Sequence, residues 1–125
     1  MYTACETTNR EDVLYIMDND KLFEVGMPDG DIIARKEGRW DPFKSYPGVR
    51  YIKVMDGQGE IVAICRWAEY SEVAASCHYY IHPFYFGQGI SKDCVNALET
   101  WFAQNTQVIK CICEVPICCS HPIGA

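Results

Sequence analysis

Residues 81–91 read Ile81-His82-Pro83-Phe84-Tyr85-Phe86-Gly87-Gln88-Gly89-Ile90-Ser91. This order of residue types predicts a strand that ends at the proline, a turn through two glycines and the first turn of a helix. The first N–H groups of a helix have no partner within the helix, and the helix dipole places positive potential at the same point. Because glycine has no side chain, a ligand can lie directly against the backbone there. The segment therefore predicts a phosphate-binding site.

The neighbouring segments predict a single α/β domain over residues 1–125. Thr7, Thr8 or Asn9 is expected to cap a first helix that ends near Asp18, and residues 21–25 are expected to form a second short one. Strands are predicted over residues 2–5, 49–55, 60–67, 75–82 and 108–115, with a hairpin turn at 56–59 and a helix over 91–104. The three middle strands form an antiparallel meander. A right-handed crossover through the helix makes the last strand parallel to the strand over 75–82.

The segment over residues 26–48 is expected to be a long, partly ordered loop, because Gly, Pro and Asp are frequent in it. Its aromatic residues form either the lid of a ligand site or a hydrophobic plug over the sheet. Its basic residues either meet an acidic acceptor or partner, or are solvated. They are Arg35, Lys36, Arg39 and Lys44.

The composition excludes several classes of protein. Apolar residues make up 49% of the 125 residues, too many for a disordered chain. The formal net charge of -6 argues against a nucleic-acid binder or a membrane-surface protein. No run approaches the roughly 18 apolar residues of a membrane span, and the charged N-terminus does not resemble a signal peptide. We therefore expect a cytoplasmic protein without nucleic-acid or membrane partners.

The eight cysteines are predicted to be mostly buried, reduced thiols. A metal site near Cys111-x-Cys113 is the alternative, with Cys118, Cys119 and His121 following closely. Structural zinc sites usually contain Cys-x-x-Cys pairs, which this sequence lacks. We therefore expect no bound metal.

With these elements in place, residues 81–91 resemble the acetyl-coenzyme A signature of the Gcn5-related N-acetyltransferase (GNAT) superfamily. That signature is an apolar residue, any residue and Pro, followed by Arg/Gln-x-x-Gly-x-Gly/Ala at the start of a helix. The resemblance extends from about Tyr2 to Pro116. It implies an acetyltransferase-like α/β core, with a mixed, mostly antiparallel sheet flanked by helices. The family continues with a helix that carries a tyrosine often used as general acid, and then two more strands. We expect this helix and these strands to be lacking here.

The resemblance also implies a binding site for acetyl-CoA. Tyr79 and Ile81 would offer backbone groups to the pantetheine arm, and backbone N–H groups from Gly87 to Ser91 would hold the pyrophosphate. Phe86 stands where the family has Arg or Gln, and Ser91, where it has Gly or Ala, is expected to cap the helix. Lys92 would add a cation. The expected binding residues are Tyr79, Ile81, Phe86, Gly87, Gln88, Gly89, Ile90, Ser91 and Lys92.

The function that the resemblance implies is transfer of an acetyl group from acetyl-CoA to an amine by direct attack. The acceptor is a small amine, a protein lysine or a protein N-terminus. Such a reaction needs a base for the amine and an acid for the thiolate. The candidates are His78, Tyr80, His82 and Glu114, each of which can also be an ordinary sheet residue.

The alternative function is that of a catalytically inactive acetyltransferase-like protein, such as a small viral factor, that binds and modulates a protein partner. The substituted Phe86 and the absence of any tyrosine after Tyr85 favour it. An abbreviated core leaves sheet edge and apolar surface uncovered, so a homodimer is also expected.

Overall fold

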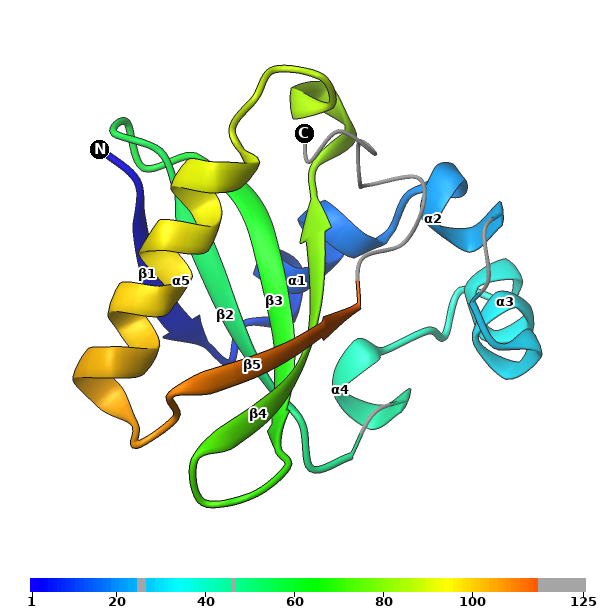
Figure 1. The fold of residues 1–125 in the computed structure, drawn as a ribbon. Helices are drawn as coiled ribbons and strands as arrows, with labels where there is room; N and C mark the ends of the chain where they lie inside the picture. Colours follow the sequence, from blue (N-terminus) through cyan, green and yellow to red (C-terminus); the bar gives the residue numbers. More distant parts are fainter. Residues whose placement is uncertain (25–26, 46, 115–125) are drawn as a thin grey trace.

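A five-stranded sheet forms the centre of the computed structural model, which describes residues 1–24, 27–45 and 47–114 (Figure 1). The strands follow the order β1-β2-β3-β4-β5. The first four run antiparallel to their neighbours, and β5 runs parallel to β4, which confirms the predicted meander and crossover. Their bounds are β1 Thr3–Thr7, β2 Arg50–Met55, β3 Ile61–Glu69, β4 Ala74–Ile81 and β5 Lys110–Glu114.

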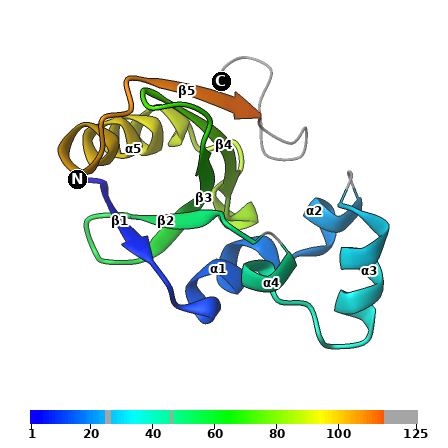
Figure 2. The ribbon, with the colours of Figure 1, turned by 90° about the horizontal axis from the view of Figure 1, so that it is seen from below.

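Helices cover both faces of this sheet. The long helix α5 (Ser91–Asn105) lies on one face, and the shorter α1, α2, α3 and α4 lie on the other side (Figure 2). A 3-10 turn, η1 (Pro83–Tyr85), connects β4 towards α5. The short helices are α1 Arg10–Met17, α2 Asp20–Glu24, α3 Asp29–Lys36 and α4 Pro42–Ser45. None of the helices in the described part of the chain is long and apolar enough to cross a membrane.

Strands β3 and β4 are central because they are apolar on both faces. Cys65, Cys77 and Tyr79 belong to the hydrophobic core under α5. Ile64 and Tyr80 belong to a second core under α1. Side chains alternate between the faces of a strand, so the nearly continuous apolar run of β3 supplies both cores.

Helix α5 packs on the sheet through an apolar stripe. Leu98, Trp101 and Phe102 are buried, and Trp67 of β3 lies edge-on to both aromatic rings, with centroid distances of 6.0 and 5.1 Å. Val95 of the same helix is 40% exposed and lies at the border of the packed surface. Aromatic and aliphatic burial of this kind is the largest favourable contribution to folding.

The hairpin and the first helix cap are confirmed. The Asn9 side chain accepts a hydrogen bond from the N–H of Glu11 (2.9 Å), as expected of an N-cap. In the hairpin, the Gly59 N–H donates to the Asp56 carbonyl at 3.1 Å. Val115, expected at the end of the last strand, lies outside the described residues.

The expectation of a loop over residues 26–48 is wrong, because α3 and α4 lie within it. Helix α3 has Asp29 and Asp31 in its first turn and Arg35 and Lys36 in its last turn, an arrangement that stabilises a helix dipole. Gly38 follows its end with a φ of 72°, a conformation that glycine adopts readily. These signals were present in the sequence, but the frequency of Gly, Pro and Asp hid them.

Contacts of the described residues favour the plug over the lid. Trp40 is buried and lies edge-on to Phe23, with ring centroids 4.9 Å apart. Arg35 binds Asp18 and Asp20 at 2.6 and 2.9 Å, so part of the basic cluster is neutralised within the molecule. Tyr46 lies outside the described residues.

Candidate functional site

In the described part of the chain, strand β4 has neighbours on both sides only in its first part. It pairs with β3 as far as Ile81, but the described ladder with β5 ends at His78, opposite Glu114. Figure 1 shows β4 and β5 pointing in different directions towards their ends. For the last residues of β4, Tyr79 to Ile81, the pairing seen in the described part of the chain is with β3.

The backbone of these residues can be oriented from one hydrogen bond. The His82 N–H donates to the Val62 carbonyl of the β3 side at 2.9 Å. Backbone groups alternate in direction along a strand, so those of Tyr80 also face β3, whereas those of Tyr79 and Ile81 face away from it. The N–H and C=O groups of these two residues thus point to the side of β4 on which β5 lies.

A tight turn then leads from β4 to α5. The Phe86 N–H donates to the Pro83 carbonyl (3.1 Å) and the Gln88 N–H to the Tyr85 carbonyl (3.2 Å). Gly87 and Gly89 have φ angles of 79° and 72°, where a side chain would be strained. A Cβ atom built on either glycine meets no atom within 4 Å, so a ligand can approach the backbone directly.

The turn delivers the chain to the N-terminus of α5. Ile90 is the N-cap, and no side chain in the described part of the chain caps this helix end. The expectation that Ser91 caps the helix is wrong, because Ser91 is already its first helical residue. Its first N–H groups and the helix dipole remain available to an anion. Lys92 is exposed beside them, and Asp93 supplies the opposite charge in the same turn.

Phe86 stands apart from the other residues of the turn. Its side chain is partly buried and packs against both hydrophobic cores. It therefore anchors the turn to the sheet, and only its backbone is placed to meet a ligand.

His82 is held in one orientation. Its Nδ1 accepts a hydrogen bond from the Phe84 N–H at 3.1 Å, and its ring stacks on that of Tyr15 with centroids 4.7 Å apart. Burial lowers the pKa of His82 below its usual value, which favours the neutral ring. Because Nδ1 is the acceptor, the ring proton belongs on Nε2, and the remaining lone pair is already engaged. The stacking partner Tyr15, on α1, carried no signal in the sequence.

The other acid–base candidates lie along β4 and β5. The side chains of His78 and Tyr80 belong to the face covered by α1, since they alternate with Cys77 and Tyr79. Tyr80 is buried, and His78 is half-buried at the last residue paired with β5. Glu114 is the register partner of His78; its side chain lies outside what the structure describes.

This arrangement agrees with a family comparison. The model of the acetyltransferase (GNAT) family matches residues 13–117. The chain belongs to the GNAT acetyltransferase family. No curated protein sequence matches it.

Solved structures show the same acetyltransferase fold at low sequence identity. The ribosomal-protein-alanine N-acetyltransferase from Brucella melitensis biovar Abortus 2308 has a TM-score of 0.60 at 13% identity, over 93% of this chain and 81% of that one. AAC(6')-Iy in complex with the bisubstrate analog CoA-S-monomethyl-acetylneamine has a TM-score of 0.52 at 14% identity, over 91% and 79%. A variant of the spermidine N-acetyltransferase SpeG from Vibrio cholerae has a TM-score of 0.53 at 18% identity, over 84% and 65%.

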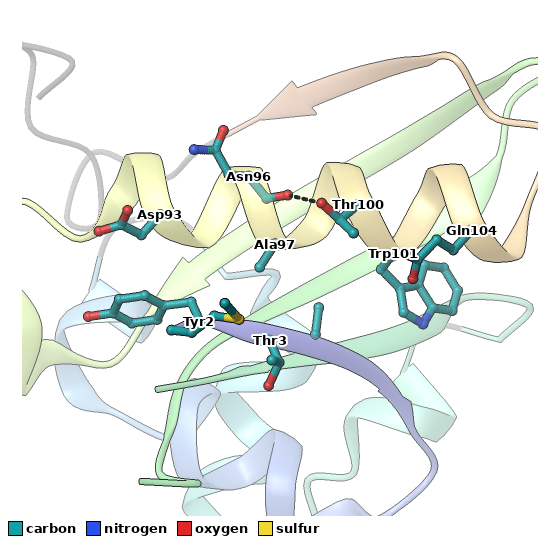
Figure 3. A pocket seen from close by; sticks show the side chains of 10 residues that line it. Tyr2, Thr3, Asp93, Asn96, Ala97, Thr100, Trp101 and Gln104 are labelled. Atoms are coloured by element: carbon teal, nitrogen blue, oxygen red, sulfur yellow. Dashed lines mark hydrogen bonds between the residues drawn. The ribbon is translucent and has the colours of Figure 1, made fainter. Parts of the chain in front are cut away.

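Two grooves flank α5 in this GNAT domain. One, of about 750 Å³, lies towards β1; Figure 3 shows Asp93, Ala97 and Gln104 of α5 above Tyr2 and Thr3. We call it the β1-side groove. The other, of about 620 Å³, lies towards β4 and β5 and includes Tyr79. We call it the β5-side groove. Of the two grooves, it is the one whose lining includes Tyr79, near the end of β4.

Most thiols of the described residues are buried or half-buried, which makes them poor nucleophiles. Cys65, Cys77 and Cys94 are buried, Cys5 is half-buried and Cys111 is exposed, all of them as free thiols. Burial raises the pKa of Cys94, whose thiol lies beside the Tyr79 hydroxyl, so it stays protonated. Among the described residues, no three His, Cys, Asp or Glu side chains are grouped so that they could hold a metal ion.

Proposed function

We propose that this GNAT protein is an N-acetyltransferase that transfers an acetyl group from acetyl-CoA to an amine. The observation that carries the proposal is the glycine turn after β4, which leads directly to the N-terminus of α5, where no side chain of the described residues caps the helix. An extended pantetheine arm carries amide groups that can hydrogen-bond to backbone at the end of β4, near Tyr79 and Ile81. A pyrophosphate suits the helix end that follows.

The glycine turn supports the same coenzyme. Gly87 and Gly89 leave space above the backbone, and the N–H groups from Gly87 to Ser91 line the approach to the helix end. Gln88 and Ile90 contribute through their backbone, and Lys92 adds a positive charge. Phe86 contributes by holding the turn against the sheet.

The proposed reaction is one direct displacement. The acceptor nitrogen attacks the carbonyl carbon of the thioester, a C–N bond forms and the C–S bond breaks. One proton leaves the amine, and the departing thiolate takes up a proton. Backbone N–H groups at the end of β4 are suited to stabilise the negative charge on the carbonyl oxygen.

We propose His78 as the general base. Among the described residues, it is the last of β4 that pairs with β5, and it directly precedes the proposed binding residues Tyr79 and Ile81. Tyr80 is buried, and the Nδ1 lone pair of His82 already accepts from the Phe84 N–H, so both residues are less suited to this role. Glu114, directly across the ladder from His78, is the second candidate.

The acceptor class is an amine, either a small molecule or a protein lysine or N-terminus. Two of the structures with this fold are named for ribosomal-protein alanine and for spermidine. The net charge of -6 suits a cationic amine, because opposite charge speeds encounter. We propose a cytoplasmic enzyme, in keeping with the free thiols among the described residues, and a homodimer through its edge strands.

The test is calorimetric titration with acetyl-CoA, followed by mass spectrometry of acetylated spermidine and of a peptide with N-terminal alanine. Binding in the micromolar range and a mass gain on an amine are expected. No binding at high micromolar acetyl-CoA would overturn the proposal. Binding without transfer to any amine would instead favour an inactive protein that binds a partner.

A further inference from the structure

We propose that Tyr15 of α1 is a positioning residue for the coenzyme: its ring fixes the His82 ring, and His82 fixes the turn that leads to α5. This inference rests on the proposed function, since it assumes that acetyl-CoA binds at the glycine turn. It goes beyond that function because it makes the coenzyme site depend on α1, a helix that lies outside the turn.

His82 joins the end of β4 to the turn through three hydrogen bonds. Its N–H donates to the Val62 carbonyl, and its carbonyl accepts from the Tyr85 N–H, both at 2.9 Å. Its Nδ1 accepts from the Phe84 N–H at 3.1 Å, which makes the imidazole the cap of η1. The first two bonds involve backbone groups alone, whereas the third requires one orientation of the ring, because Nδ1 lies on one edge of the imidazole. The shape of the turn therefore depends on how this ring is held.

Phe84 transmits the constraint to the glycines. Its N–H is bound by His82, and its carbonyl accepts from Nε2 of Gln88 at 2.9 Å. The Gln88 N–H also donates to the Tyr85 carbonyl at 3.2 Å. Gln88 lies between the two glycines of the turn, and glycine restricts its own backbone least of all residues. The N–H groups proposed to bind the pyrophosphate are therefore oriented by these hydrogen bonds rather than by local stiffness of the chain.

Tyr15 fixes the orientation of the His82 ring. The two rings are stacked, with centroids 4.7 Å apart and planes inclined by 25°. Tyr85 meets the imidazole edge-on, at a centroid distance of 6.2 Å and an angle of 73°. A ring confined by one stacked and one edge contact cannot turn its Nδ1 away from the Phe84 N–H without losing both contacts.

The packing of α1 on the sheet depends on other residues of the helix. Val13, Ile16 and Met17 are fully buried, whereas Tyr15 is 52% exposed. Removal of the Tyr15 ring therefore leaves the contact between α1 and the sheet in place and releases His82. This difference in burial makes it possible to distinguish a positioning role from a structural one.

The first test is calorimetric titration of acetyl-CoA into the unmodified protein, Tyr15→Ala and Tyr15→Phe. A stacked aromatic pair typically changes an equilibrium by about threefold to tenfold, so we expect Tyr15→Ala to raise the Kd by about this factor. Tyr15→Phe keeps the ring and should bind as the unmodified protein does.

The same titrations separate the possible failures. An unchanged Kd in Tyr15→Ala would overturn the inference and leave the proposed function intact. A lower stoichiometry with the same Kd would show a merely structural role and would also refute the inference. No binding to the unmodified protein would overturn both.

Tyr70→Ala is the matched control. Tyr70 is also an exposed tyrosine, but it follows β3 and precedes β4, whereas His82 follows the other end of β4. We expect its Kd for acetyl-CoA to equal that of the unmodified protein. A similar loss of affinity in both alanine variants would assign the effect to the removal of any exposed tyrosine and contradict the inference.

The second test leaves Tyr15 unchanged and uses the titration of the His82 ring. A proton on Nδ1 converts the acceptor into a donor, which cannot bind the Phe84 N–H. The titratable side chains whose rings contact His82 are Tyr15 of α1 and Tyr85 of η1, and a phenol ordinarily titrates at about pH 10. The contact from β3 is the uncharged Val62 carbonyl. Among these groups, the imidazole is therefore the one that changes charge between pH 5 and 7.5.

The measurement compares the unmodified protein with His82→Asn at pH 7.5 and pH 5. Asparagine can accept from the same N–H but does not titrate. Loss of one hydrogen bond corresponds to about threefold or more in an equilibrium, so we expect the Kd to rise on acidification by at least this factor more in the unmodified protein. The phosphates of acetyl-CoA titrate alike in both experiments and cancel in the comparison. An equal rise in the two proteins would mean that the His82 ring does not hold the coenzyme turn and would overturn the inference.

Discussion

The two parts of strand β4 carry similar residues but have different neighbours. From Ala75 to His78 the strand pairs with β3 on one side and β5 on the other. From Tyr79 to Ile81 the described pairing is with β3, and the glycine turn follows. The first part therefore stabilises the fold, and the second brings the chain to the turn and the N-terminus of α5.

The difference teaches that the candidate site is made of main-chain groups rather than of unusual side chains. Backbone groups that are buried without partners cost free energy, so those of a turn or a helix end lie where water or a ligand can satisfy them. Here the glycine turn continues into the end of α5, so two sets of main-chain groups adjoin. Most of the proposed coenzyme contacts then depend on geometry that many side chains permit.

The largest effect is expected from Gly89→Asp in the turn between β4 and α5. The new carboxylate occupies the backbone approach and repels a pyrophosphate, and juxtaposed like charges cost several kcal/mol. We expect the affinity for acetyl-CoA to fall by about 100-fold or more, since about 1.4 kcal/mol is tenfold. Calorimetric titration measures it.

The matched control is Gly38→Asp. Gly38 has the same φ of 72° and equally open surroundings, but it follows α3 on the opposite side of the sheet. Both variants carry the same backbone strain, so unfolding by urea should shift alike. Similar loss of acetyl-CoA affinity in the control would show that strain, not the site, caused the effect.

The next largest effect is expected at the boundary between the two parts, with His78→Gln. Glutamine keeps a polar side chain of similar reach but cannot accept the proton of the amine. Loss of a general base typically lowers the rate about 100-fold or more. Steady-state kinetics over a range of pH should also show that the acidic limb of the kcat/KM profile disappears.

Ser76→Ala serves as the control for His78, because Ser76 lies two residues earlier on the same face of β4 and is also half-buried. Its pH profile should match that of the unmodified protein. If His78→Gln keeps the acidic limb, the base is a different residue, with Glu114 as the next to substitute.

Local sequence signals predicted the elements that surround the candidate site. The two-sided apolar run of β3, the Asp56 to Gly59 turn and the stripe of α5 each follow one short-range rule, so their positions agree with the structure. Helix α3 was missed because its charged ends were read as loop composition. Short-range rules therefore recover elements whose pattern lies within a few residues.

The site itself was only partly readable. Gly87 and Gly89 announce a turn that needs positive φ, and that signal is local. The pairing of β4 with β5 and the groove beside Tyr79 depend on packing between segments far apart in the chain, for which no local pattern exists. The stacking of Tyr15 on His82 belongs to the same class, since it joins α1 to the end of β4.

A smaller effect is expected from Lys92→Ala in the first turn of α5. An exposed cation near a phosphate contributes about 0.5–1 kcal/mol, so the affinity for acetyl-CoA should fall about twofold to fivefold and depend less on salt. Lys36→Ala is the control, since Lys36 is exposed on α3. Titrations at two salt concentrations measure both. An unchanged salt dependence would mean that Lys92 does not face the phosphates.

The smallest effect is expected from His82→Asn, directly after β4, and concerns the free energy of unfolding. Burial lowers the pKa of His82 in the folded protein below its usual 6.5, so between these two values the unfolded chain binds more protons. The free energy of unfolding should therefore fall as the pH drops below about 6.5 and level off below the folded-state pKa. Asparagine does not titrate, but its side-chain oxygen can still accept from the N–H two residues on, as Nδ1 does from Phe84. Urea unfolding between pH 5 and 7.5 should then show a shallower pH dependence for the variant. If the free energy of unfolding of the variant depends on pH as steeply as that of the unmodified protein, other groups cause the pH dependence. The idea that the His82 ring is held neutral after β4 would then be wrong.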